Sequence, residues 1–172
     1  MEKIRYKAYK ELSLKKEQEK LAKELLFSDS FEYYRELKEL HKEDWEIFYT
    51  KLKEELKSHN SWYFRDKYLK VITFERDLPE LMEFVRENPR SIEEYANMLV
   101  DKYKNEVIDI YKKSIMLEAS SSSKRSHYRQ VCRMLEKFKK IAGKKKQGEM
   151  INELSIKYKR RPAFLDELEK IK

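Results

Sequence analysis

The sequence has little of what sheets, tight turns and disulfides require. Its 172 residues include only two glycines, three prolines and one cysteine, Cys132. Sheet proteins depend on many turn residues, so this composition argues against strands and favours helices. A lone cysteine excludes a disulfide within the chain and is typical of a reducing compartment. We therefore expect an all-α protein of the cytoplasm.

Membrane and targeting segments are also missing from the pattern. No apolar run approaches the roughly 20 residues that a membrane-crossing helix needs. The first residues carry charges every few positions and lack the apolar stretch of a signal peptide. No membrane partner is therefore predicted.

Charge and aromatic content are high by contrast. Charged residues make up 42% of the chain, while hydrophobic residues make up 40% and aromatic residues 13%, which is enough apolar surface for a folded core. The charge is unevenly distributed, because the residues after Ser123 include 16 Lys and Arg but only 6 Asp and Glu. This asymmetry is the one electrostatic indication of a partner.

Apolar residues return every third or fourth position in most of the chain, as on one face of a helix. The stripe over 44–57 is clear, and it consists of Trp45, Phe48, Tyr49, Leu52 and Leu56. Ser91, with Glu94 three residues later, has the pattern of a capping box and predicts a helix that reaches Tyr103. Pro79 and Pro162 suit the first turns of two further helices, and Gly143 suits a left-handed helix end.

These patterns predict nine or ten short helices packed as antiparallel hairpins, in a right-handed-solenoid-like or irregular array. Residues 1–29 are predicted as a charged N-terminal helix that is able to project from the body, with one continuous helix over 2–26. Residues 30–172 are predicted as a single helical-hairpin domain, with a basic C-terminal part over 124–172.

Breaks between these helices are expected at short polar segments. Asp29 and Asn60 belong to two predicted loops, Asn105 separates two helices, and the four serines over 120–123 predict a flexible loop. A shift of 62 positions also aligns the apolar stripe that begins at Tyr33 with the one that begins at Tyr95. Either the chain repeats a helix hairpin, as α-solenoids do, or two amphipathic hairpins match by chance.

No catalytic, cofactor-binding or metal-binding residues are predicted. The soft metal ligands are Cys132 and three histidines, His41, His59 and His127, and no CxxC, HxxxH or HExxH spacing occurs. Cys132 lies on an apolar stripe, where a thiol is usually inert. We do not expect an enzyme.

The basic C-terminal part is the candidate site. A stripe of cations at steps of three and four faces away from the apolar stripe that includes Tyr128 and Leu135. Such a surface either contacts the phosphates of a nucleic acid or is a solvated face that aids solubility. A structural role is a further possibility, because Asp166 and Glu167 could reach back to the Arg160–Arg161 pair. The candidate contact residues are Lys124, Arg125, Arg129, Arg133, Lys144, Lys145, Lys146, Arg160 and Arg161.

One family resemblance rests on the C-terminal end. The segment Tyr128–Cys132, the Met150, Ile151 and Leu154 stripe, and the run over 158–168 (YKRRPAFLDEL) are similar to the C-terminal helical region of bacterial SWIM zinc finger proteins. The resemblance extends over 30–172 and implies an all-helical region that mediates protein or nucleic-acid contacts. The zinc motif of that family, CxCx(n)CxH, is absent, so zinc binding does not carry over. We expect either a segment of a longer protein or a shorter relative.

Two functions follow as hypotheses. The first is a non-catalytic helical scaffold, or protein-interaction module, of a SWIM-finger-like protein, whose partner is another protein or domain. The second is an accessory nucleic-acid-binding module that uses the basic C-terminal surface. Binding to oligonucleotides at different salt concentrations separates the two.

Overall fold

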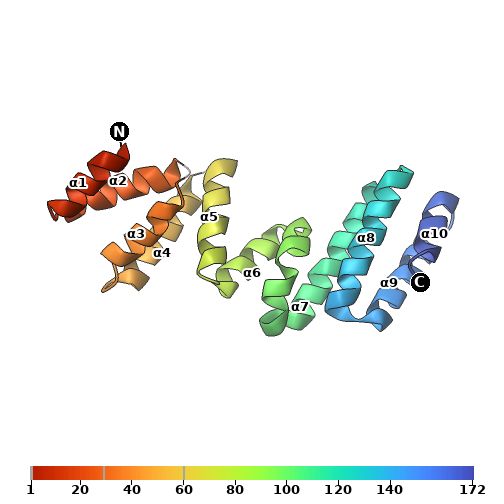
Figure 1. Ribbon diagram of the computed structural model, residues 1–172. Helices are drawn as coiled ribbons and strands as arrows, with labels where there is room; N and C mark the ends of the chain where they lie inside the picture. Colours follow the sequence, from red (N-terminus) through yellow and green to blue (C-terminus); the bar gives the residue numbers. More distant parts are fainter. Residues whose placement is uncertain (1, 29, 60) are drawn as a thin grey trace. The chain divides into compact units, whose positions relative to one another are not determined.

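The computed structural model describes residues 2–28, 30–59 and 61–172 (Figure 1). Within these ranges it contains ten α-helices and one short 3₁₀-helix, and no strand, which confirms the all-α prediction. Asp29 and Asn60, both expected in loops, lie outside the described residues. No helix in the described part of the chain is long and apolar enough to cross a membrane.

Contacts between residues divide the chain into two compact units, Met1–Asp77 and Leu78–Lys172. The sequence placed a boundary after residue 29 and none beyond it, whereas the contacts place the boundary between Asp77 and Leu78.

Unit 1 contains α1 (Glu2–Glu11), α2 (Lys15–Phe27), α3 (Glu32–Leu40), α4 (Trp45–Ser58) and α5 (Trp62–Phe74). Helix α1 packs on α2, α2 on α3, and α4 on α5. The predicted stripe of α4 is confirmed at four positions, because Phe48, Tyr49, Leu52 and Leu56 are buried.

The single helix predicted over 2–26 is wrong, because the backbone turns between α1 and α2. Ser13 adopts a left-handed conformation with φ of 56°. Its N–H donates to the carbonyl of Lys10 at 3.2 Å, and the N–H of Leu14 donates to the carbonyl of Tyr9 at 3.0 Å. These two bonds form the Schellman motif that closes many helices. Glycine usually holds the left-handed position, so a serine there gave no signal in the sequence.

Helix α1 does not project from unit 1. Tyr6 is buried, and its ring meets the ring of Tyr33 edge-on at 4.9 Å between centroids. The Tyr6 hydroxyl accepts a hydrogen bond from Gln18 of α2 at 3.0 Å and donates to Glu36 of α3 at 3.2 Å. The N-terminal helix is therefore attached to both of its neighbours.

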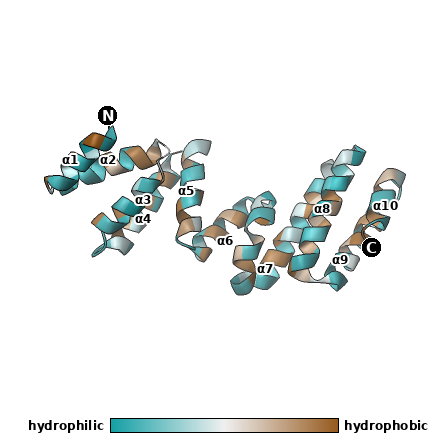
Figure 2. Cartoon of the chain, in the orientation of Figure 1, coloured by the Kyte–Doolittle hydropathy of each residue, from teal (hydrophilic) through white to brown (hydrophobic). Residues whose placement is uncertain are grey.

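Unit 2 contains α6 (Leu78–Glu87), the 3₁₀-helix η1 (Pro89–Ser91), α7 (Ile92–Ser121), α8 (Arg125–Ala142), α9 (Lys144–Lys157) and α10 (Pro162–Glu169). Helix α8 packs against α7, α9 and α10. Its inner face is fully buried at Val131, Leu135 and Phe138. Hydrophobic and hydrophilic residues alternate around the helices, as expected when one face of each is buried (Figure 2).

Helix α7 bends back on itself. Tyr103 has non-helical angles, with φ of −124° and ψ of 34°. Glu93, before this break, and Ser114, after it, line the same pocket, although a straight helix would place them about 30 Å apart. The predicted hairpin is thus present, with its break at Tyr103 instead of Asn105.

Two local predictions near the ends of α7 are wrong. Ser91 does not cap the helix, because its hydroxyl donates to the carbonyl of Asn88 at 2.6 Å and the residue belongs to η1. The serine tract is not a loop throughout, since α7 continues to Ser121. The hydroxyls of Ser120 and Ser122 donate to carbonyls three and four residues earlier, at 2.7 Å each, which lets serine continue a helix.

The shift of 62 positions that aligns the two apolar stripes in the sequence also aligns helix boundaries in the structure. Helix α3 ends at Leu40, and 62 positions later the first limb of α7 ends before Tyr103. Helix α4 covers Trp45–Ser58, which corresponds to residues 107–120 of the second limb. Tyr33, Leu37, Phe48 and Tyr49 are buried, as are their counterparts Tyr95, Leu99, Ile110 and Tyr111. Helix ends and buried positions therefore coincide across the 62-residue shift, as they would for a repeated hairpin or for two amphipathic hairpins that match by chance.

Candidate nucleic-acid interface

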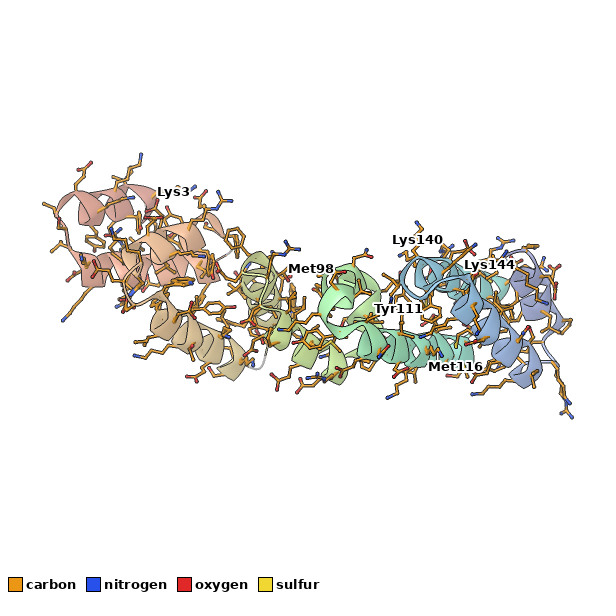
Figure 3. All side chains as sticks on the ribbon, turned by 90° about the horizontal axis from the view of Figure 1, so that it is seen from below. Lys3, Met98, Tyr111, Met116, Lys140 and Lys144 are labelled. Atoms are coloured by element: carbon orange, nitrogen blue, oxygen red, sulfur yellow. The ribbon has the colours of Figure 1, made fainter. Side chains whose placement is uncertain are left out.

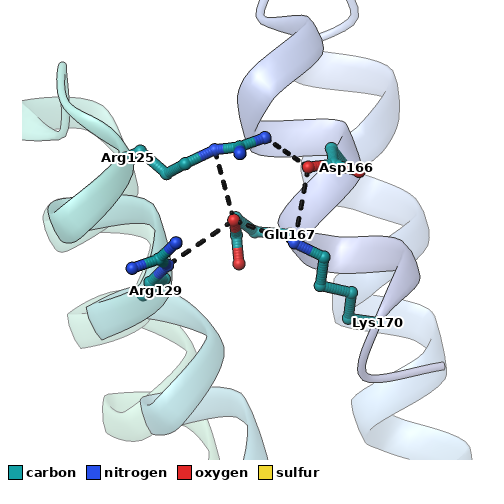
Figure 4. A network of polar contacts seen from close by, with 5 residues as sticks. All are labelled: Arg125, Arg129, Asp166, Glu167 and Lys170. Atoms are coloured by element: carbon teal, nitrogen blue, oxygen red, sulfur yellow. Dashed lines mark hydrogen bonds and ion pairs between the residues drawn. The ribbon is translucent and has the colours of Figure 1, made fainter.

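The structure assigns different roles to the nine basic residues predicted as a contact surface. Arg125 and Arg129 lie on the side of α8 that faces α10 (Figure 4). Arg125 pairs with Asp166, and its Nε lies 3.3 Å from Oε1 of Glu167. Nε of Arg129 lies 3.6 Å from the same Glu167 oxygen. These two arginines therefore join α8 to α10.

Glu167 is the centre of this α8–α10 clasp. Its side chain is 7% exposed and lies 3.1 Å from Nζ of Lys170, which is one turn further along α10. The Lys170 ammonium, followed by the guanidinium groups of Arg129 and Arg125, lowers the pKa of the Glu167 carboxyl below its ordinary value of 4.5. A carboxylate with a lowered pKa stabilises the fold above that ordinary value, and its contribution is lost as the pH falls through the lowered pKa.

Arg161 also has a structural role. Its Nη1 donates to the carbonyls of Ser122 at 2.8 Å and Ala119 at 3.2 Å, where α7 ends. Its guanidinium carbon lies 4.5 Å from the ring centroid of Tyr158. The clasp predicted between the Arg160–Arg161 pair and Asp166–Glu167 is therefore wrong in its partners, because Arg161 holds the end of α7 instead.

The neighbouring residues Arg160 and Arg161 give a matched pair of substitutions. Arg161→Gln is expected to lower the free energy of unfolding of unit 2 by about 1–3 kcal/mol, because it removes charged donors from two helix-end carbonyls. Arg160 is exposed, so Arg160→Gln should change it by less than about 0.5 kcal/mol. Urea unfolding followed by circular dichroism measures both. Equal effects of the two substitutions would contradict the role assigned to Arg161.

The other candidate residues remain at the surface. Arg133 hydrogen bonds to Gln130 on its own helix and is exposed. Lys124, Lys144, Lys145 and Arg160 are exposed, and Lys146 is half-buried. None of these last five has an ion-pair partner among residues 2–28, 30–59 and 61–172.

Lys139 belongs to the basic surface, although it was not among the residues predicted from the spacing along the helix. It lies in the last turn of α8 beside Lys140, close to Lys144 at the start of α9. Between Glu136 and Glu149 the chain contains six lysines and no acidic residue. Reading the sequence across the turn, instead of along one helix, would have found it.

The soft metal ligands do not form a metal site. In the described part of the chain no group of three or more His, Cys, Asp or Glu side chains could hold a metal ion. His41 lies between Glu19 at 3.3 Å and Asp44 at 3.0 Å and stacks on Phe48, and His59 stacks on Phe64. Burial, together with the negative charge of Glu167, raises the pKa of the Cys132 thiol to about 11. The thiol is therefore protonated at neutral pH, as its place on the apolar stripe indicates.

One pocket of about 540 Å³ lies between the two limbs of α7 and α8. Glu93 and Lys137 face each other in its lining, with 2.5 Å between Oε1 and Nζ. Ser114, also in the lining, is buried, and its hydroxyl has no hydrogen-bond partner in the described residues. Among the remaining lining residues, Arg90, Glu94 and Glu118 carry charges of both signs, and their arrangement indicates no particular ligand.

Comparisons with protein-family models, curated proteins and solved structures found no match to this chain. The resemblance to SWIM zinc finger proteins therefore stays a prediction.

Proposed function

We propose that this chain is a non-catalytic helical scaffold, part of a SWIM-finger-like protein, that recognises another protein. The observation that carries the proposal is the exposure of Trp62, in the first turn of α5. Its side chain is 80% exposed. Tryptophan is enriched among the residues that contribute most to protein–protein affinity, because it buries a large apolar area at a small entropy cost.

The neighbours of Trp62 show how it is held outward. Of the three successive aromatic residues, Tyr63 donates a hydrogen bond to the carbonyl of Phe27, and Phe64 packs edge-on against the ring of Phe27 at 5.4 Å. Ser61 caps α5 by accepting a hydrogen bond from the N–H of Phe64 at 3.4 Å. With Tyr63 and Phe64 turned toward α2, the helix presents Trp62 to solvent on a fixed backbone.

A photo-crosslinking amino acid at position 62 tests this proposal. In the cells that make the protein, a crosslinker in place of Trp62 should give one discrete adduct of higher mass with a protein partner. The same crosslinker in place of Ile47, an apolar residue of α4 that is 61% exposed, should not. Identical adducts from both positions, or none from position 62, would exclude Trp62 as the contact.

The partner identified in this way allows a quantitative measurement. Trp62→Ala should weaken its binding about 30-fold, which corresponds to about 2 kcal/mol for a central interface residue. The thermal midpoint of the variant should be unchanged, because the side chain makes few contacts within the fold. Unchanged affinity in titration calorimetry would contradict the proposal.

A further inference from the structure

Five lysines gather where α8 turns into α9. We define the lysine turn as Lys139, Lys140, Lys144, Lys145 and Lys146. Lys140 and Lys144, on either side of Gly143, both lie beside this turn (Figure 3). Gly143 has φ of 88°, a backbone conformation that glycine adopts readily, so the chain reverses within one residue and brings the two lysine groups together.

Within residues 2–28, 30–59 and 61–172, no acidic side chain pairs with the lysine turn. The nearest acidic groups in sequence are Glu136 and Glu149, and Glu136 accepts a hydrogen bond from Gln147 at 2.8 Å. This distinguishes the lysine turn from Arg125, Arg129 and Arg161, whose charges are used inside unit 2.

Helix stability does not account for these lysines. The first turn of α9 carries Lys144, Lys145 and Lys146 and no acidic residue. Cations at a helix N-terminus oppose the helix dipole and destabilise the helix. Lys139 and Lys140, at the end of α8, have the favourable sign, so only the second half of the lysine turn weakens its own helix. A charged surface that lowers the stability of its own helix points to a ligand of opposite charge.

The surroundings of the lysine turn indicate which polyanion it suits. In the described residues the exposed large apolar side chains nearest to it in sequence are Leu117 and Ile156. Ile141, within the turn, is half-buried, so the turn presents no fully exposed apolar side chain for insertion into a membrane. Phe138, the adjacent aromatic residue, is completely buried and cannot stack on an unpaired base. A repeating phosphate backbone requires neither contact.

We propose that the lysine turn is a contact for the phosphate backbone of double-stranded nucleic acid, without base readout. This inference goes beyond protein recognition and does not depend on it. The proposed site differs from the basic surface predicted from the sequence, because Arg125, Arg129 and Arg161 do not take part. Binding is independent of sequence and driven by the release of counterions.

The test uses the whole chain and a fluorescently labelled duplex of mixed sequence. If all five lysines contact phosphates, log Kd should change with log salt with a slope of about 4.5, so affinity falls about 500-fold between 50 and 200 mM salt. Replacing the five lysines of the turn by glutamine should weaken binding at 50 mM salt at least about 100-fold and flatten this slope. The thermal midpoint of this variant should be unchanged or higher, because three cations leave a helix N-terminus.

A matched variant removes the same charge elsewhere. Unit 1 offers five exposed lysines that have no ion pair with any described residue: Lys7, Lys15, Lys16, Lys20 and Lys42. Their replacement by glutamine lowers the net charge from +8 to the same value as in the lysine-turn variant, and it should leave duplex affinity within about threefold of the unmodified chain. Equal losses in the two variants would mean that net charge alone matters and would overturn the site.

Three further outcomes would overturn the proposal. The first is the absence of duplex binding by the unmodified chain at 50 mM salt. The second is tighter binding to a single strand of the same length than to the duplex, which would indicate base stacking. The third is stronger binding to vesicles of phosphatidylserine and phosphatidylcholine than to the duplex, which would indicate a membrane partner.

Discussion

Phe138→Ala is expected to lower the free energy of unfolding of unit 2 by about 3–5 kcal/mol. The ring of Phe138 is completely buried on α8 and packs against Tyr111 of α7, with 5.5 Å between ring centroids. Alanine would remove these contacts and leave a cavity where α8 meets the second limb of α7. Because α8 also packs on α9 and α10, the loss should affect the whole unit.

The control for this substitution is Leu117→Ala. Leu117 lies on α7, and it is 47% exposed. Its replacement should cost less than about 1 kcal/mol, since little apolar area is lost and alanine favours helix. Urea unfolding of both variants measures the difference, and equal losses would mean that the burial of Phe138 does not control the stability of unit 2.

Alkaline pH is expected to destabilise both units through groups that are buried in the neutral form. In unit 2, burial raises the pKa of Cys132 from 9.0 to about 11. Burial, helped by the negative charge of Glu93, also raises the pKa of Tyr111 above its ordinary value of 10.0. In unit 1, burial raises the pKa of Tyr6 to about 12 and that of Tyr34 further.

The sign of this pH effect follows from linkage. Each group has a higher pKa in the folded chain than in the unfolded chain, so the unfolded chain loses its protons first as the pH rises. Stability is therefore complete below about pH 9 and falls from there through the raised values. Cys132 alone contributes a loss of about 2 kcal/mol by pH 11, and Tyr111 adds to this loss above about pH 10.

Tyr111→Phe tests the tyrosine part of this prediction. The Tyr111 hydroxyl is buried, and it has no hydrogen-bond partner in the residues that the structure describes. The variant should be as stable as the original chain at pH 7, or up to about 1 kcal/mol more stable, and should lose less stability above pH 10. Thermal unfolding at several pH values between 7 and 11.5 would show this, and an unchanged alkaline slope would contradict it.

Helix faces were predictable because burial follows a simple period. The stripes that include Leu52, Leu99 and Leu135 are buried as the spacing indicated. The prolines at the starts of α6 and α10 also follow from local chemistry, since a proline N–H is not needed in the first turn. Such features depend on neighbours three or four residues away.

Helix ends were less predictable, because two of them depend on residues other than glycine in a left-handed backbone conformation. Ser13 and Arg76 both hold left-handed conformations that usually indicate glycine, with φ of 56° and 53°. In each case two backbone hydrogen bonds close the preceding helix, and for Arg76 these are the bonds Arg76–Thr73 and Asp77–Ile72. The side chain gives no signal of such a turn.

The candidate site was predicted in composition but not in detail. Sequence spacing placed Arg125 and Arg129 on an outward stripe, since cations seldom face a helix neighbour. Both arginines instead form ion pairs with Glu167 of α10, which lies 38 or more positions away in the sequence. A pairing over that distance depends on how α10 packs on α8, which the sequence pattern does not contain. The lysine turn, by contrast, is local and could be read directly.

His41 and Tyr103, 62 positions apart, each mark the place where a helix is interrupted. This spacing has a consequence for how such a chain can change in length. If the two hairpins arose by duplication, unequal recombination between their gene segments would add or delete about 62 codons, the distance between equivalent points. Because the two segments would be joined at equivalent positions of the hairpin, the three- and four-residue spacing of the buried residues would continue across the junction. Homologous chains of different size should therefore differ by whole multiples of this increment more often than by single helices.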